Sequence, residues 1–327
     1  MPRPNVTIDG KQYDEHDPLG GLTAQMDEDK ANHCSVTLAY QFDHEHSKFP
    51  NLPRKHLQPG SDVSISMGYG ETGADTRVFT GSIETVETKF PAKESPRVVV
   101  TAYGPLREMM KGSHSRSWRN ESLGRIVESV CQEYVKSAHV KGADLTLEHE
   151  VQHNESDYAF IEGLANRFGY RFSCYLEDVY FEPITGGTSP DDPVATLKYP
   201  ESLESFSGTT TDPEYGEVEV RCRNERQDKT IVASATNDSG TGKHVVHSQV
   251  DSRKKAKEIA EAEIGAKRRT GYAETAGNPE LQAGTVVSLK GVAPAYSGKH
   301  RVTEATHRFG KRGLTTDFKT SLIKSSQ

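Results

Sequence analysis

The stretch Leu57-Gln58-Pro59-Gly60-Ser61-Asp62-Val63-Ser64-Ile65 occurs a second time near the other end of the chain, as Leu281-Gln282-Ala283-Gly284-Thr285-Val286-Val287-Ser288-Leu289. Both copies place Leu-Gln before a glycine and follow it with apolar residues that recur in a strand-like pattern. A second match follows each copy, since Gly81, Ile83, Val86 and Phe90 correspond to Gly298, Val302, Ala305 and Phe309. Two copies so far apart indicate one small β-domain used twice, because a solenoid would repeat many times at a short period.

The repeat also predicts how chains associate. A chain with two equivalent β-domains can build a six-fold ring from three subunits, because closed rings form when equivalent surfaces recur around an axis. The predicted fold class is therefore mainly β with an α+β insertion. Two related barrel-like β-domains per chain are expected to form a pseudo-six-fold ring in a trimer.

The local patterns divide the 327 residues into three parts. Residues 1–105 alternate like antiparallel strands and form the first β-domain. Residues 106–206 form the insertion, with two helices that we expect to begin at caps Asn120 and Asn154. Their apolar stripes are Leu123, Ile126, Val127, Val130 and Tyr134, and then Phe160, Ile161, Leu164, Ala165 and Phe168, before a stop at Gly169. Residues 207–327 form the second β-domain, with one polar helix at about 252–269.

The composition narrows the class of function. Only 33% of residues are hydrophobic and the mean hydropathy is −0.70, which indicates thin domains, long loops or a solvent-filled channel. The net charge of −7 argues against specific or sequence-independent nucleic-acid binding, which needs clustered cations on phosphates. The short basic cluster at 267–269 is more simply a complement to a helix C-terminus.

The cysteines and the apolar runs indicate a protein made in the cytoplasm. Cys34, Cys131, Cys174 and Cys222 are scattered, with no C-x-x-C spacing, and are expected to be reduced core thiols. The N-terminus shows no signal-peptide core, and no apolar run is long enough for a membrane span.

One motif invites a catalytic interpretation that the local pattern opposes. His149-Glu150-Val151-Gln152-His153 matches the zinc-protease pattern H-E-x-x-H, which needs both histidines on one helical turn. Leu145, Leu147 and Val151 instead alternate with polar residues and predict a strand, in which His149 and His153 stand roughly 13 Å apart. We expect no metal, cofactor or catalytic residue here. The cluster Asp43-His44-Glu45-His46 is interpreted as a solvated loop, and no P-loop or dinucleotide motif is present.

The segment Gln152-His153-Asn154-Glu155-Ser156-Asp157, followed by Leu164-Ala165 and Gly169, resembles the phage late control D family. Tyr158 stands where an aliphatic residue is commoner in that family. The ending is similar as well, at Gly284, Val287, Leu289, Gly298, Val302, His307, Phe309 and residues 315–318. These proteins are baseplate hubs of contractile tails and are related to the hub portion of type VI secretion spike proteins.

The resemblance implies a structural protein and not an enzyme. It implies a homotrimeric collar that adapts the six-fold inner tube to a three-fold spike, in a virion tail baseplate or injection-system particle. The implied partners are the spike, the tube or tube-initiator protein, and the tape-measure protein. Because the chain ends at Gln327, just after the second β-domain, the spike is expected to be another polypeptide. The lumen is expected to be polar and not strongly basic, with Ser61, Ser64, Ser66, Thr285 and Ser288 on such surfaces.

Two alternatives come from other classes. The first is a cell-wall or protein hydrolase at a tail tip, with a possible zinc site at His149 and His153. The second is a carbohydrate-binding or other β-rich module. Stoichiometric zinc would favour the hydrolase, whereas trimer formation would favour the hub.

Overall fold

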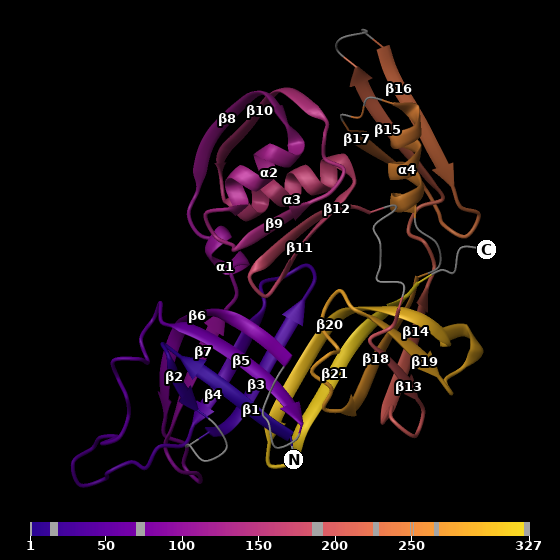
Figure 1. Ribbon diagram of the computed structural model, residues 1–327. Helices are drawn as coiled ribbons and strands as arrows, with labels where there is room; N and C mark the ends of the chain where they lie inside the picture. The colour runs from indigo at the N-terminus through magenta and orange to yellow at the C-terminus, as the bar shows by residue number, and fades with distance from the viewer. Residues whose placement is uncertain are drawn as a thin grey trace.

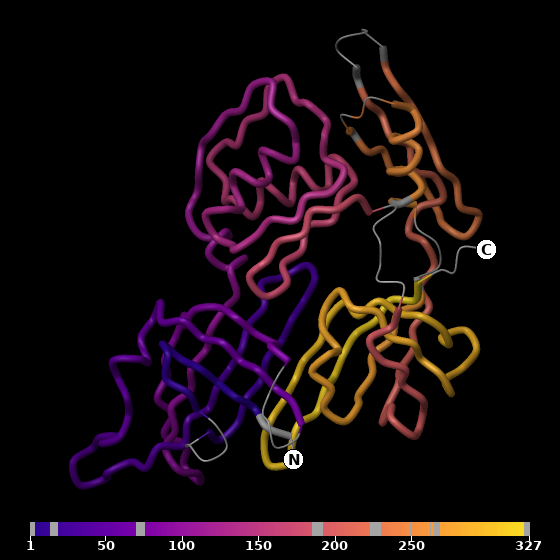
Figure 2. Tube along the Cα trace, viewed as in Figure 1, coloured from indigo at the N-terminus to yellow at the C-terminus, as the bar shows by residue number. Residues whose placement is uncertain are grey.

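A computed structural model shows a large β-structure with two smaller units on one side of it (Figure 1). The structure describes residues 2–13, 19–69, 76–184, 192–224, 229–248, 250, 252–264 and 268–323. In Figure 2 the two ends of the colour scale, indigo and yellow, lie side by side in the β-structure, and the magenta and orange segments lie above it. The predicted mainly β fold with an α+β insertion is confirmed.

The first copy of the repeat forms seven strands. They are β1 (Pro2–Ile8), β2 (Lys11–Tyr13), β3 (Leu19–Asp27), β4 (His33–Leu38), β5 (Asp62–Tyr69), β6 (Thr76–Lys89) and β7 (Arg97–Tyr103). Alternate residues point to the core, as Val63, Ile65 and Met67 do in β5, because successive side chains of a strand face opposite sides.

The second copy forms β13 (Ala195–Lys198), β14 (Ser205–Thr211), β18 (Arg268–Ala276), β19 (Val286–Lys290), β20 (Gly298–Gly310) and β21 (Gly313–Leu322). A short 3₁₀ turn, η1 (Pro294–Tyr296), precedes β20. Strand β3 of the first copy pairs antiparallel with β20 of the second. The two copies are therefore joined into one 13-stranded sheet over a shared core.

The repeated Leu-Gln-x-Gly block makes the same turn in both copies. Gly60 and Gly284 both have φ of +90°, a conformation that favours glycine. The N–H of Gly60 donates to the carbonyl of Ile83, and the N–H of Gly284 donates to the carbonyl of Val302, both at 2.8 Å. These bonds tie each turn to the following long strand, so the sequence match is also a match of backbone geometry.

The long strands also share a β-bulge. The register of β6 against β7 shifts between Ile83 and Thr85, and that of β20 against β21 shifts between Val302 and Glu304. Ile83 and Val302 are therefore equivalent, as the sequence predicted. The predicted match of Gly81 with Gly298 is wrong by two residues. Gly81 pairs with Val63, and Val287, the equivalent of Val63, pairs with His300, so His300 is the counterpart of Gly81.

Strand order extends the equivalence to the whole copy. The first copy runs β3-β4-β7-β6-β5-β1 and the second β14-β18-β21-β20-β19-β13. The copies differ at the last strand, since β1 is antiparallel to β5 whereas β13 is parallel to β19. A shared order of strands is the result expected of a duplicated domain.

The insertion has its own core between two helices and two small sheets. Its elements are α1 (Leu106–Met109), β8 (His114–Ser122), α2 (Leu123–Cys131), β9 (Ser137–Val140), β10 (Thr146–Glu155), α3 (Asp157–Phe168), β11 (Tyr170–Tyr175) and β12 (Asp178–Pro183). Strands β8 and β10 pair with each other, and β11, β12 and β9 form the second sheet. The predicted stripes of both helices are buried, except that Tyr134 lies beyond the end of α2.

Both helices begin two residues later than the sequence predicted. The caps are Ser122 and Ser156, whose hydroxyls accept hydrogen bonds from the N–H groups of Arg125 and Ala159. The predicted caps Asn120 and Asn154 instead have φ of +50° within β8 and β10. The short polar side chain of asparagine, which also suits a helix cap, tolerates this left-handed conformation, so both residues interrupt the regular strand geometry instead of capping a helix.

A further unit interrupts the part of the chain assigned to the second β-domain. Strands β15 (Glu217–Asn224), β16 (Lys229–Thr236) and β17 (Lys243–Ser248) form a separate sheet, which α4 (Arg253–Ile264) covers around a core of its own. The predicted helix at about 252–269 therefore ends too late, because β18 begins at Arg268; Lys267 of the basic cluster lies outside the described residues. This unit connects β14 to β18, the place occupied in the first copy by the short hairpin between β3 and β4.

Buried His307 predicts that the second copy loses stability in acid. Burial lowers the pKa of His307 to about 4, so the folded protein keeps this histidine neutral while the unfolded chain takes up a proton near pH 6.5. Its contribution is complete above pH 6.5 and is lost as the pH falls towards 4, a decrease of about 3 kcal/mol in the free energy of unfolding.

Denaturant unfolding between pH 7.5 and 4 measures this effect. His307→Gln should be less stable at pH 7.5, because the bond between Nδ1 and the Thr316 hydroxyl changes, but should show a flatter pH dependence. Exposed His149→Gln is the matched control and should keep the wild-type slope. Equal slopes in all three proteins would contradict the role of His307.

Candidate functional site

The H-E-x-x-H segment lies in β10, so the prediction that residues 149–153 are extended is confirmed. His149 and His153 are exposed on the outer face, roughly 13 Å apart along the strand, too far to share one zinc ion. Glu150 faces the other way, is buried, and pairs with Arg167 of α3. The geometry therefore gives no zinc-protease site.

The cluster at residues 43–46 lies in a loop. His46 pairs with Asp43 through Nδ1 and Oδ2 at 2.8 Å, and both side chains are partly or largely exposed. Within the described ranges, no group of three or more His, Cys, Asp or Glu side chains is placed to hold a metal ion. No helix of the described part is long and apolar enough to cross a membrane.

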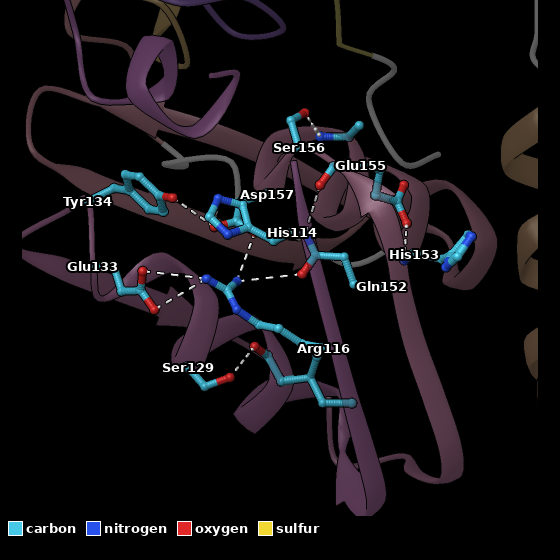
Figure 3. Close-up of polar contacts among 12 residues, drawn as sticks. His114, Arg116, Ser129, Glu133, Tyr134, Gln152, His153, Glu155, Ser156 and Asp157 are labelled. Atoms are coloured by element: carbon cyan, nitrogen blue, oxygen red, sulfur yellow. Dashed lines mark hydrogen bonds and ion pairs between the residues drawn. The ribbon is translucent and has the colours of Figure 1, made fainter. Parts of the chain in front are cut away.

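The best-developed polar site joins β8, β10 and the start of α3 (Figure 3). The Arg116 guanidinium donates to Asp157 Oδ1 at 2.8 Å, and the Gln152 amide donates to the same oxygen at 2.7 Å. The Tyr134 hydroxyl donates to Asp157 Oδ2 at 2.7 Å. Asp157 and Gln152 are fully buried, so the carboxylate of the first residue of α3 is held from three separate directions.

These contacts explain the charge state of the site. Burial alone would raise the pKa of Asp157, but the hydrogen bonds from Gln152, Tyr134 and Arg116 outweigh it and hold the pKa below its usual range. Burial, together with the bond to Asp157, raises the pKa of Tyr134 to about 12. The carboxylate is thus ionised and already used as an acceptor, which suits a structural lock better than a general base.

Gln152 and Asp157 were named in the sequence only as parts of the segment that carries the family resemblance. Arg116 was missed because it belongs to no recognisable pattern, and Tyr134 was assigned only to the apolar stripe of the first insertion helix. Arg116 is opposite Gln152 in the β8–β10 ladder, a pairing that depends on a register between distant segments. The signal that could have found the site is the acidic residue directly after Ser156, because a carboxylate in the first turn of a helix is favoured by the positive end of the helix dipole.

Gly169, which ends α3, is required both for its backbone conformation and for its close contact with Ile259. Gly169 has φ of +74° and is the left-handed C-cap, whose N–H donates to the carbonyl of Ala165. A Cβ there would lie 2.9 Å from Cγ1 of Ile259 in α4. Gly169 therefore ends the helix and also lets the 217–264 unit pack against the insertion.

Substitutions of Gly169 at the end of α3 and of Gly163 within it are expected to change the free energy of unfolding in opposite directions. Gly169→Ala should lower the free energy of unfolding by about 2 kcal/mol, because it strains a left-handed residue and pushes on Ile259. Gly163→Ala should raise it by about 0.5–1 kcal/mol, because the exposed site has open space for a methyl group. Chemical denaturation of both variants checks the difference, and a stabilising Gly169→Ala would contradict the packing described.

The insertion is bound to the first copy through the β3–β4 hairpin. The Tyr158 hydroxyl donates to the carbonyl of Asp29 at 2.9 Å, and the Asn32 amide lies 3.4 Å from the carbonyl of Cys174. Glu28 of the same hairpin accepts hydrogen bonds from Arg301 of β20. The hairpin therefore contacts both the insertion and the second copy.

The fold agrees with three solved structures at low sequence identity. The 43 kDa tail protein of prophage MuSo2 from Shewanella oneidensis has a TM-score of 0.73 and 11% identity, over 98% of both chains. The tail protein from Neisseria meningitidis MC58 has a TM-score of 0.71 and 12% identity, over 98% of this chain and 96% of that one. The E. coli c3393 protein, described as a component of the type VI secretion system, has a TM-score of 0.62 and 14% identity, over 98% of this chain and 77% of that one. At these identities the likeness shows the fold alone.

A family model decides the classification. The search of curated proteins found no match. The model described as phage tail baseplate hub (GPD) matches residues 35–313, which include the duplicated turn, the lock around Asp157 and the second set of strands. The match does not support the hydrolase alternative, because the family is a structural one. The chain belongs to the phage tail baseplate hub family, and its role is that of a structural hub in a tail baseplate.

Proposed function

We propose that three copies of this chain close into a pseudo-six-fold collar in which β14 of one copy pairs with β6 of the next. The observation that carries the proposal is the pairing of β3 with β20 within one chain. Strand β14 is the counterpart of β3, and β6 is the counterpart of β20. Among the described strands, β14 pairs with β18 alone, and residues 85–89 of β6 pair with β7 alone.

The internal pairing also supplies the register. Gln25 pairs with Thr306, and Leu22 pairs with Phe309. Their counterparts across the proposed interface are Thr209 with Glu87, and Phe206 with Phe90. These assignments follow paired residues from strand to strand. Leu22 of β3 leads through β4 and β7 to Val86 of β6, and Phe206 of β14 leads through β18 and β21 to Ala305 of β20, the counterpart of Val86. Pairing both edges would remove a hazard, because open strand edges promote uncontrolled association.

Exposure of aromatic residues supports the same contact. Phe309 packs against the core beside Leu22, whereas its counterpart Phe90 is 59% exposed. Phe90 lies against Phe42 and Phe49, with ring centroids 5.1 and 6.3 Å away. Phe206 of β14 lines an open pocket of about 540 Å³ together with Tyr199 and Tyr296. The proposed contact would therefore cover the exposed side of Phe90 with the half-buried Phe206 of the next copy.

We further propose that this collar adapts a six-fold tube to a three-fold spike and takes no catalytic part. The β-copies supply six equivalent units, and the insertions supply three. Ser64, Ser66 and Ser288 lie on the strand faces turned away from the core, which supports a polar lumen through which a tape-measure protein passes. We propose as well that the chain is synthesised in the host cytoplasm before the particle assembles.

A cysteine pair tests the interface and its register. Glu87→Cys with Thr209→Cys should give disulfide-linked species up to three times the 36.1 kDa of one chain after mild oxidation. The bond must join different chains, because β6 and β14 are far apart in the order of strands. Non-reducing electrophoresis measures the products.

The matched control moves one cysteine by two residues. Glu87→Cys with Thr211→Cys keeps the same strands and the same faces, but moves one cysteine roughly 7 Å along its strand, so that the two are diagonal and no longer directly opposite. It should link poorly. Equal linking of both pairs, or no linked trimer from the first pair, would refute the proposed register.

A further inference from the structure

A cleft of about 320 Å³ lies where the insertion meets the second copy of the repeat. One wall is the outer face of β11 and β12, which presents Arg171, Ser173 and Tyr180. The other wall is the repeated turn at 283–285 with Arg301, and Glu28 of the β3–β4 hairpin closes one end. The volume is within the range of sites for small molecules.

The carboxylates of the cleft are already used. Glu28 accepts from Arg301 Nε at 2.6 Å, and Glu182 accepts from Lys141 Nζ at 2.8 Å. Within the part of the chain that the structure describes, the Arg171 guanidinium makes no hydrogen bond or ion pair of its own. Three cations and two carboxylates line the cleft, so it carries one positive charge in excess.

The free donors converge on one face. Arg171 and Ser173 are two residues apart on β11, so both side chains point the same way, and Tyr180 stands opposite Ser173 on β12. No hydrogen bond connects the Ser173 or Tyr180 side chain to another described residue. Burial, and then repulsion from Arg301, lower the pKa of Arg171, and they outweigh the opposite effect of the nearby carboxylates of Glu28, Asp29 and Glu182. A desolvated cation without a hydrogen-bonded anion is unfavourable.

We propose that this cleft binds a small oxyanion through Arg171, Ser173 and Tyr180. A guanidinium donates two parallel hydrogen bonds to a carboxylate or phosphate, and the two hydroxyls can satisfy the remaining oxygens. The ligand would balance the excess charge at the junction of the insertion, the hairpin and the second copy. Every residue of the site belongs to one chain, so the inference does not depend on the proposed ring.

Inorganic phosphate and acetate are the probes. Calorimetry and thermal unfolding of the full chain, at constant ionic strength set by chloride, should show saturable binding and a rise in Tm with one or both anions. Binding of acetate would identify carboxylate as the accepted chemistry, as on an acidic side chain of a partner. Binding of phosphate alone would identify the tetrahedral anion.

Variants separate a built site from a general salt effect. Arg171→Gln should weaken binding about tenfold or more. Tyr180→Phe, which keeps the ring stacked on His139, should weaken it several-fold while leaving the Tm in chloride unchanged. Exposed Arg119→Gln on β8 is the matched control and should bind like the wild type. The proposal is overturned if neither anion exceeds chloride, or if Arg171→Gln and Tyr180→Phe bind as tightly as the wild type.

Discussion

Phe90→Asp should leave the chain folded and convert the proposed collar into monomers. Phe90 is 59% exposed in the single chain, so a carboxylate there stays in water and removes only the contacts with Phe42 and Phe49, at about 1–2 kcal/mol. In the ring the same side chain would face Phe206 of the next copy, where an unpaired carboxylate costs about 2 kcal/mol or more. A closed ring contains this contact three times, so the sum is about 6 kcal/mol, or a loss of about 10⁴ in the overall association constant.

Sedimentation of the purified variant measures this change directly. Val151→Asp is the matched control, because Val151 is also an exposed apolar residue, 45% accessible, on the outer face of β10 and outside the proposed interface. It should remain associated like the wild type. A trimeric Phe90→Asp protein, or equal dissociation of both variants, would argue against the β6 edge as the contact.

Leu164→Asp should unfold the insertion and prevent baseplate assembly. Leu164 is 2% exposed on α3 and belongs to the separate core of the insertion. Truncating a buried leucine costs about 2–5 kcal/mol, and an unpaired carboxylate adds several more. The total approaches the whole stability of an ordinary domain, about 5–15 kcal/mol.

Hydrogen exchange can locate the damage, because the core of the large sheet is distinct from that of the insertion. Amides of α2 and α3 should exchange rapidly, whereas those of β20 and β21 should stay protected. Gly163→Asp places the same residue one position away, at an exposed site with open space, and should remain protected throughout. Slow exchange of α3 in Leu164→Asp would contradict the packing of this helix.

The sequence predicted what depends on local pattern. The turns at Gly60 and Gly284 were recognisable because a left-handed glycine between Leu-Gln and an alternating run has few other uses. The stripes of α2 and α3 were recognisable because helical spacing leaves a strong periodic signal. The prediction that His149 and His153 form no zinc site also rested on a local pattern, the strand-like alternation around them.

The failures have a common physical cause, which is pairing between distant segments. Leu147 and Val151 were expected to belong to one regular alternation, but Leu147 is buried and Val151 is exposed. The alternation breaks between them, because Glu148 and His149 are both exposed where the chain passes the irregular Asn120. Strand β8 was missed because its sequence is almost wholly polar, and its register is set by β10. The pairing of β3 with β20, which joins the copies into one sheet, left no trace in either sequence alone.

The β3–β4 hairpin and the 217–264 unit occupy equivalent places in the duplicated fold, and both contact the insertion. The short connection does so through Asp29 and Asn32, and the long one through Ser248 and Ile259. Neither contact lies on β6 or β14. Insertions or deletions in these two connections can therefore tilt the attached domain while the strand edges stay unchanged. A lineage can in this way refit its hub to a new neighbour without redesigning the strand edges through which the proposed ring would close.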